Sequence, residues 1–406
     1  MPLLPVTSPS RGFLAVALAG GAVFALALGI RQAQPLFIGA LNTQTGIGYA
    51  SVSLAFAVGQ LMWGVAQPIA GAIGDRYGPR RVMIAGTLML VIGTAATPLA
   101  QGAALLTFLI GVVSASGAGA LGLSLIVSAA NRWIPEAKRS VAAGIINAGG
   151  AFGQFTLIPF AQLMIGIAGW HPAMMLLGAT GLLALPLLYY LTRESAPAGG
   201  GSAGATTLAQ AVGEAWRDRS FLLLNAGFFT CGFHVAFIAT HLPGVVASCG
   251  LPASIGAWSL AIIGLFNMAG SIWIGRKVQT VRMKIALAWT YFARAAIVMA
   301  FYFAPKTEMA FFLFAAGIGF TYLSTVPPTV GLVAKLHGPR YVATLFGIVM
   351  LSHQVGGFLG AWLGGKAFEA TGNYDWMWFA DIALCLFAAL VHLPIREARV
   401  RAAAAA

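Results

Sequence analysis

Apolar residues run along this chain in stretches of about twenty, and short segments between the stretches hold most of the charged residues. A helix of about twenty residues rises ~30 Å, which is the thickness of the hydrocarbon core of a membrane. The period-two alternation of a barrel strand is missing, and in lipid the backbone groups must be paired within each segment. The pattern therefore predicts an all-α membrane protein.

We expect twelve membrane-spanning helices. The first six cover residues 13–41, 50–74, 82–100, 105–131, 141–165 and 172–191. The other six cover residues 221–246, 255–278, 285–304, 309–334, 342–367 and 375–393. The first stretch is too long for a cleavable signal peptide and is not followed by a small-residue cleavage site.

The hydrophobic pattern is interrupted once, at residues 193–220, which are rich in Gly, Ala and Ser and end in a short amphipathic stretch. Such a composition is typical of a flexible linker. It predicts two bundles of six helices, residues 1–192 and 221–406, joined by a linker on the cytoplasmic side.

Composition agrees with this interpretation, because 59% of the residues are hydrophobic and only 8% are charged, against about a quarter in a soluble domain. The chain has no metal-spaced cluster of His and Glu, no phosphate-binding loop and no soluble domain large enough for one. We expect no enzyme activity, no cofactor, no metal and no ATP-driven pump. Cys231, Cys249 and Cys385 lack metal or redox spacing and are expected to be free thiols.

Charge predicts the orientation. One side of a twelve-span arrangement, here called the basic side, collects Arg11, Arg76, Arg80, Arg81, Arg132, Lys138, Arg139, Arg193, Arg217, Arg219, Arg276, Lys277, Arg282, Lys284, Lys335, Arg340, Arg396, Arg399 and Arg401. The opposite side has only Lys306 and Lys366. The positive-inside rule makes the basic side cytoplasmic, with both termini inside. The net charge of +13 is then a topology signal, and no nucleic-acid partner is expected.

The two halves resemble each other. Residues 144–153, GIINAGGAFG, and residues 347–356, GIVMLSHQVG, have glycines at both ends of the same interval, in spans five and eleven. Arg76 opens the loop after span two, and Arg276 opens the loop after span eight. A tandem repeat of six helices is one way to build a carrier whose substrate site lies between the halves.

The loop after the second span carries a family resemblance. Its residues are Gly71, Asp75, Arg76, Gly78, Arg80 and Arg81. They resemble the signature loop of the major facilitator superfamily between its second and third helices, although Pro79 stands where a basic residue is usual. The resemblance implies two pseudo-symmetric six-helix bundles and secondary transport by alternating access.

A narrower resemblance covers nearly the whole chain. Residues 29–41, 227–243, 324–329 and 351–365 are similar to a bacterial branch of the monocarboxylate-transporter-like group, which includes YcxA-type proteins. Monocarboxylate transporters carry an aspartate in helix eight and a substrate-binding arginine four residues later. Asn267 and Ser271 occupy these positions here. The resemblance therefore implies a fold and a transport class, and lactate-type transport is not carried over.

Asp75 is the only acid of the signature loop. It can meet the positive end of a helix dipole or a neighbouring arginine while the inner face is closed, and opening would break those contacts. Alternatively, the loop arginines anchor the topology and contact lipid headgroups. We favour a gating role for Asp75, Arg76, Arg80 and Arg81.

Charges inside spans are costly and point to function. Arg31 lies ~27 Å along the first span, where Gln34 shares its face and Pro35 can bend the helix. The Arg31 side chain either binds substrate or extends outward to water. Because helix one forms a wall of the cavity in the superfamily that the chain resembles, we favour substrate binding. Arg294 in span nine and Asp381 in span twelve are expected to form a structural ion pair.

Histidines within the spans are further candidates. His234 and His241 are seven residues apart on one face of span seven, and His353 with Gln354 interrupts span eleven where its repeat partner has Gly150. A histidine can exchange a proton near neutral pH or donate a hydrogen bond to an anion, but it can equally be a satisfied residue between helices. His353 is the best functional candidate.

Residues 114–124 in span four and 321–329 in span ten are interrupted by Gly and Pro at corresponding places, a pattern that points toward a binding site. Small residues alone could mean tight packing. Tyr322, Ser324 and Thr325 add polar groups that packing does not require, so part of the cavity is expected there.

The expected function is alternating-access transport of a small organic anion with proton coupling, across the inner membrane of a bacterium, by a monomer. The alternative is a proton-linked exporter of drugs or other amphipathic compounds, whose helix-four arginine and helix-five Gly-Pro signature are missing. A receptor or passive structural role also stays open. The expected substrate-binding residues are Arg31, Gln34, His234, Asn267, Tyr322, Ser324, His353 and Gln354.

Overall fold

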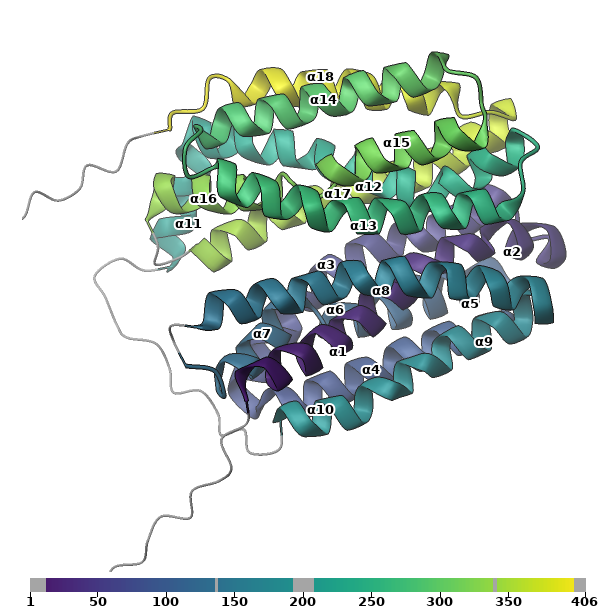
Figure 1. Ribbon diagram of the computed structural model, residues 1–406, viewed down its shortest axis with the longest axis horizontal. Helices are drawn as coiled ribbons and strands as arrows, with labels where there is room; N and C mark the ends of the chain where they lie inside the picture. Colours follow the sequence, from purple (N-terminus) through teal and green to yellow (C-terminus); the bar gives the residue numbers. More distant parts are fainter. Residues whose placement is uncertain (1–11, 136–137, 193–207, 339–341, 398–406) are drawn as a thin grey trace, which may run out of the picture.

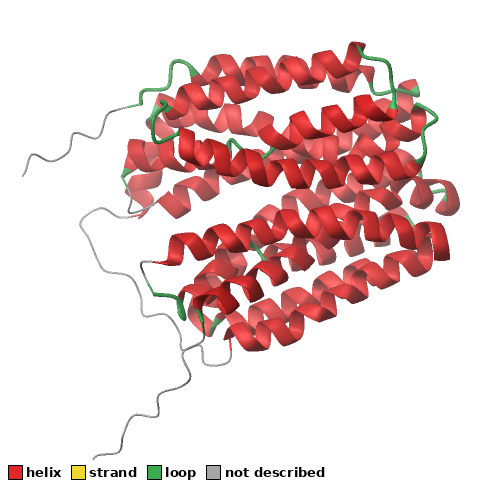
Figure 2. Ribbon diagram, viewed as in Figure 1, coloured by secondary structure: helices red, strands yellow, loops and turns green. Residues whose placement is uncertain are grey.

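The computed structural model describes residues 12–135, 138–192, 208–338 and 342–397. These residues form helices joined by short loops, and no strand occurs among them (Figure 2). The prediction of an all-α membrane fold is confirmed for this part of the chain.

Ten α-helices and four short helical segments build the first half. They are α1 (Phe13–Ala33), η1 (Gln34–Phe37), α2 (Ile38–Thr45), α3 (Tyr49–Tyr77), α4 (Pro79–Ala95), η2 (Thr97–Leu99), α5 (Ala103–Leu106), the π-helix η3 (Thr107–Ser114), α6 (Ala115–Ala120), α7 (Leu123–Asn131), α8 (Arg139–Ala168), α9 (Trp170–Thr180), η5 (Gly181–Leu183) and α10 (Ala184–Thr192). Each short segment continues or joins the helices beside it.

Eight helices follow. They are α11 (Leu208–Arg217), α12 (Arg219–Ser248), α13 (Ala253–Lys277), α14 (Met283–Phe303), α15 (Glu308–Thr321), α16 (Val326–His337), α17 (Val342–Thr371) and α18 (Asp375–His392).

Eleven helical runs of the described residues are long and apolar enough to cross a membrane. The twelfth expected span corresponds to α4, whose 17 residues are just short of that length. About 17 residues is the lower end of the range for a spanning helix, so the count of twelve is approximate.

Proline interrupts two spans. Pro35 has no backbone N–H, and the chain passes from α1 through η1 into α2 at this point. In span ten, α15 ends at Thr321 and α16 begins at Val326, with prolines in its first turn. The amide of Val326 donates to the carbonyl of Leu323, so the carbonyl of Tyr322 loses its usual helical partner. Both interruptions expose polar backbone atoms inside the membrane.

The two halves pack in the same way, with α1 on α8 in one and α12 on α17 in the other. Figure 1 shows α1–α10 as one group of helices and α12–α18 as another. Gly153 of α8 lies directly against the backbone of Ala25, and Gly356 of α17 lies against the backbone of Phe229. A Cβ at either glycine would collide with that backbone. The glycines that end the repeated ten-residue segments therefore hold equivalent helix pairs together.

The halves meet through α3 with α17 and α8 with α13. Away from the basic side, Tyr49 and Tyr374 are joined by a hydrogen bond of 2.8 Å between their hydroxyls. Near the middle, Gln154 donates to the carbonyl of Leu260 at 3.0 Å. Figure 1 shows that α1 begins, and α10 and α18 end, on the same side of the molecule.

Candidate functional site

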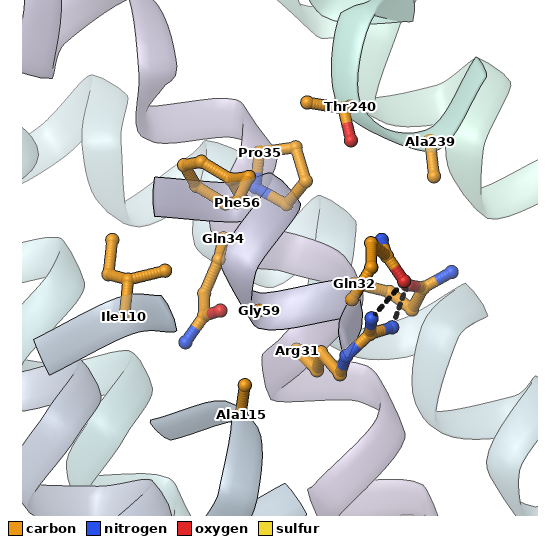
Figure 3. A pocket seen from close by; sticks show the side chains of 11 residues that line it. Arg31, Gln32, Gln34, Pro35, Phe56, Gly59, Ile110, Ala115, Ala239 and Thr240 are labelled. Atoms are coloured by element: carbon orange, nitrogen blue, oxygen red, sulfur yellow. Dashed lines mark hydrogen bonds between the residues drawn. The ribbon is translucent and has the colours of Figure 1, made fainter. Parts of the chain in front are cut away.

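A small cavity lies beside the bend between α1 and η1 (Figure 3). Its volume is about 20 Å³, room for about one water molecule. Gln60 of its wall is eleven residues after the start of α3, ~16 Å from that helix end and well inside the spanning helix. The lining residues come from both halves and are Arg31, Gln32, Gln34, Pro35, Phe56, Gly59, Gln60, Ile110, Ala115, Ala239 and Thr240.

Arg31 contributes the charge of this cavity. Its Nη2 donates to Oε1 of Gln60 at 2.5 Å, and its Nη1 donates to Oε1 of Gln32 at 3.3 Å (Figure 3). The guanidinium carbon lies 4.5 Å from the ring centroid of Trp63, a cation–π distance. The ion pairs among the described residues all involve other side chains. Neutral groups therefore hold this half-buried cation, and its charge is uncompensated.

Gln34 points away from Arg31, although the two share a helix face in the sequence (Figure 3). Its Nε2 donates to Oγ1 of Thr94 at 2.9 Å and to Oγ of Ser114 at 2.8 Å. These contacts tie η1 to α4 and η3. The amide nitrogen of Gln34 therefore stabilises the bend and does not face Arg31.

Asn267 and Ser324 lie at the break in span ten. The side-chain oxygen of Asn267 accepts from the backbone N–H of Leu323 at 3.2 Å and from the hydroxyl of Ser271 at 3.4 Å. Ser324 donates to the carbonyl of Phe320 at 2.6 Å. These side chains satisfy backbone groups that the break exposes, and neither lines the Arg31 cavity.

Tyr322 connects the break to the middle of the molecule. It is buried, its hydroxyl donates to the carbonyl of Val235 at 3.1 Å, and its side chain lies near Arg31. Of the residues predicted in span ten, Tyr322 is the one that the structure brings near Arg31.

His353 and Gln354 are buried on α17. The ring of His353 lies 5.2 Å from that of Phe228, and its Nδ1 has no hydrogen-bond partner in the described part of the chain. Both polar atoms of the Gln354 side chain also lack partners there. Gln354 lies against Gly64 of α3, so it sits where the halves touch.

The expected ion pair between Arg294 and Asp381 is wrong. Asp381 accepts from His234, with Oδ2 and Nδ1 2.8 Å apart, and both side chains are fully buried. Arg294 instead donates Nη2 to the carbonyls of Thr321 and Tyr322, at 2.5 and 2.6 Å. The reason is the broken helix, whose free carbonyls give a guanidinium neutral acceptors that the sequence does not reveal.

The signature loop is only partly described. Arg76, Arg80 and Arg81 are exposed, and the side chain of Asp75 lies outside the described residues. The guanidinium of Arg76 lies 5.3 Å from the ring of Tyr77, and that of Arg80 lies 5.2 Å from the ring of Tyr189. These contacts stay on the basic side of the first half.

A second cavity of about 410 Å³ lies between α3, α4 and α6. Its wall is formed almost entirely by apolar side chains, among them Met62, Ile69 and Met89, with Arg81 at its edge. No predicted substrate-binding residue lines it.

Sequence reasoning missed Gln32, Gln60 and Trp63, which surround the Arg31 guanidinium. A signal existed, because Gln60 and Trp63 are three residues apart in span two and therefore share a helix face. The sequence does not show that this face turns toward Arg31.

The chain is similar to several transporters from other organisms. It is 26% identical to monocarboxylate transporter 13 of Rattus norvegicus over 342 residues, which cover 83% of this chain and 77% of the relative. It is 24% identical to the uncharacterised transporter YcxA of Bacillus subtilis (82% of each chain). It is also 24% identical to the oxalate:formate antiporter of Oxalobacter formigenes (59% of this chain and 57% of the relative).

Among solved structures, an inward-facing, unoccupied bacterial homologue of the human lysosomal transporter Spinster has the same fold. The TM-score is 0.74 at 18% identity, and the match covers 95% of this chain and 97% of the other. The model of the Major Facilitator Superfamily matches residues 13–361. Together with the helical architecture and the repeated halves, this match shows that the chain is a membrane transporter belonging to the Major Facilitator Superfamily.

Proposed function

We propose that this transporter moves a small organic anion, of the carboxylate class, by alternating access coupled to protons. The observation that carries the proposal is Arg31, a cation near the middle of the membrane whose side-chain partners are two amides and an indole. An unpaired charge at that depth costs at least ~2.5 kcal/mol on insertion scales, so a retained one needs water, a partner or a ligand.

A carboxylate is the ligand that suits this position. It would supply the missing negative charge and accept two parallel hydrogen bonds from the guanidinium. The names of two relatives, a monocarboxylate transporter and an oxalate:formate antiporter, support the same class of substrate. Asn267 and Ser271 stand where monocarboxylate transporters have the helix-eight aspartate and arginine, so we propose that Arg31 supplies the binding charge in this chain.

The cavity beside Arg31 is too small for such a ligand in this conformation. Binding therefore requires the two halves to move apart at Ala239 and Thr240, which close the cavity from α12. We propose that the signature loop, with Asp75 and its arginines, controls that movement on the basic side, and that the basic side is the cytoplasmic side of a bacterial inner membrane.

Thermal unfolding of the purified protein tests the proposal, because a ligand that binds only the native state raises the unfolding temperature. The panel consists of oxalate, pyruvate and formate, of spermidine and choline as cations, and of xylose as a neutral solute. We expect stabilisation by at least one carboxylate at millimolar concentration. Stabilisation by a cation, with none by the carboxylates, would contradict the proposal.

An exporter of amphipathic compounds is the second candidate, because the apolar cavity beside α3 and α4 is large enough for a hydrophobic group and has Arg81 at its edge. Stabilisation by a hydrophobic cation such as tetraphenylphosphonium, in the same screen, would favour this candidate.

A further inference from the structure

Ionisable side chains from three helices meet inside the second half. They are Cys231 and His234 on α12, Tyr291 and Arg294 on α14, and Asp381 and Cys385 on α18. We call this group the buried cluster. All six side chains are fully buried, and spacings of three or four residues place each pair on one face of its helix. Because burying charge is costly, a cluster of this kind inside a membrane points to function.

The hydrogen bond between His234 and Asp381 leaves one site open for a proton. With Asp381 ionised, Nδ1–H of the imidazole donates to Oδ2 over 2.8 Å, and Nε2 then carries a lone pair. Nε2 of His234 and Oδ1 of Asp381 have no hydrogen-bond partner among the described residues. A proton from water can therefore bind at Nε2, and the carboxylate stabilises the imidazolium that results.

Arg294 belongs to the same buried cluster as the carboxylate of Asp381, although the two form no ion pair. It donates Nη1 to the sulfur of Cys231 at 3.4 Å, and the sulfur of Cys385 lies 4.0 Å from Nδ1 of His234. Arg294 and Asp381 together are neutral, and a proton on His234 adds one positive charge. In a low-dielectric interior this charge is tolerated better when an anion binds nearby.

The cluster is connected to the Arg31 cavity through one residue. Arg294 donates to the carbonyl of Tyr322 at 2.6 Å, and the Tyr322 side chain lies near Arg31. The break between α15 and α16 thus touches both charged groups. An anion at Arg31 and a proton at His234 would favour each other's binding, which is the linkage that cotransport requires.

We propose that His234, hydrogen-bonded to Asp381, binds the proton whose movement is coupled to the anion. This inference rests on the proposed function. One proton binds Nε2 from water on one side of the membrane and leaves to water on the other, and no other bond changes. The other ionisable groups around the pair are Cys231, Tyr291, Arg294, Cys385 and, beside Cys231, His353. The neighbouring helices α13 and α16 carry their ionisable groups at the basic end.

Proteoliposomes separate proton coupling from binding. Counterflow of oxalate or pyruvate at equal pH needs no net proton movement, whereas accumulation driven by a pH gradient does. For Asp381→Asn we expect counterflow within about twofold of the unmodified protein and at least a tenfold loss of accumulation. His234→Gln should lose accumulation to the same extent. The matched controls are Asp375→Asn, at the exposed start of the same helix, and His171→Gln, also exposed; both should keep both activities. Undiminished accumulation in Asp381→Asn, or an equal loss of both activities in folded variants, would overturn the proposal.

A second measurement needs neither substrate nor a stable Asp381 variant. In ¹⁵N-histidine NMR of the full chain in nanodiscs, the His234 signals, assigned through His234→Gln, should show that the imidazole takes up a proton as the pH is lowered. A His234 that stays in one neutral tautomer throughout would overturn the proton site even if carboxylates are transported. If His234 titrates but no carboxylate binds or moves, the proposed function fails and the proton site stands.

Discussion

Arg31 is held by neutral groups on three sides. The oxygens of Gln60 and Gln32 accept its hydrogen bonds, and Trp63 covers the guanidinium from 4.5 Å. These partners fix the position of the charge without cancelling it. The remaining stabilisation is available to an anionic ligand, and a planar guanidinium offers that ligand two parallel donors.

Removing the paired hydrogen-bond donors of Arg31 should weaken anion binding. Arg31→Lys keeps the charge but loses the bidentate geometry, so we expect about tenfold weaker binding of the carboxylate found in the thermal screen, or ~1.4 kcal/mol. Arg31→Ala should nearly abolish binding. Isothermal titration checks both, with Arg217→Lys, an exposed arginine on α11, as the control. Equal affinity in all variants would mean that Arg31 only extends toward water.

Gln60 offers a complementary test. Gln60→Glu should place a carboxylate 2.5 Å from the guanidinium, where Gln60 now accepts. The resident carboxylate would pair with Arg31 and compete with the ligand, so anion affinity should fall by at least tenfold. Gln60→Leu, which removes the acceptor without adding charge, should retain most of the affinity. Identical binding by the two variants would argue against a free positive charge at Arg31.

The sequence identified Arg31 but not its surroundings. A charge in an apolar span is visible by itself, whereas the face that α3 turns toward it is not, because polar residues are too few along the span to mark one side. For the same reason the sequence did not reveal the partners of Gln34, which shares a face with Arg31 but donates to Thr94 and Ser114. The same holds for Arg294, whose acceptors are backbone carbonyls.

At the scale of elements, Glu397 joins two helices at the basic end of the second half, and we call its contacts with Lys335, Met283 and Lys284 the clamp. Glu397 accepts from Nζ of Lys335 at 2.8 Å and from the amides of Met283 and Lys284 at 3.2 and 3.4 Å. It joins the end of α16 to the start of α14, where its negative charge also interacts favourably with the positive end of the α14 dipole. Burial alone would raise the pKa of Glu397, but these bonds outweigh it and hold the pKa below its ordinary value.

The clamp should make stability depend on pH. Because the folded pKa of Glu397 is lowered, its stabilisation is present above the ordinary value of 4.5 and disappears as the pH falls through the folded value. We expect Glu397→Gln to lower stability by about 1 to 2 kcal/mol at pH 7 and to lose less than the unmodified protein on acidification. Thermal unfolding in nanodiscs from pH 7 to 3 measures the difference. Parallel curves for the two proteins would exclude this role for the carboxylate.

The helix interruptions were predictable from sequence, and their consequences were not. Pro35 and the prolines of α16 predict that spans one and ten bend. That Asn267 caps the amide of Leu323, and that Arg294 takes the freed carbonyls, depends on how α13 and α14 pack beside the break. Such contacts join residues far apart in the chain, and no local pattern encodes them.

At the scale of the whole molecule, the repeat in the sequence corresponds to a repeat in packing. Gly153 and Gly356 hold equivalent helix pairs, and the two halves are joined by bonds such as Gln154 to Leu260 and Tyr49 to Tyr374. The order of the spans follows from hydrophobicity alone, and their number follows from it approximately. Which side faces the cytoplasm is an expectation from charge.

Cysteine labelling checks that orientation. In a Cys249→Ser background, Arg217→Cys on α11 should resist a membrane-impermeant maleimide in intact cells and react after lysis. Glu308→Cys, at the opposite end of the helices, should react in intact cells; both positions are exposed. Reversed labelling of the two positions would place the basic side outside.

Counterflow in proteoliposomes tests the central claim most directly, namely that this chain carries a small organic anion held by Arg31. Liposomes loaded with unlabelled oxalate, pyruvate or formate are diluted into the same labelled compound at trace concentration, with empty liposomes and Arg31→Ala as controls. The account predicts transient accumulation of at least one labelled carboxylate by the unmodified protein and almost none by Arg31→Ala. Failure to exchange any carboxylate, together with exchange of a labelled cation or neutral solute by the same preparation, would contradict it.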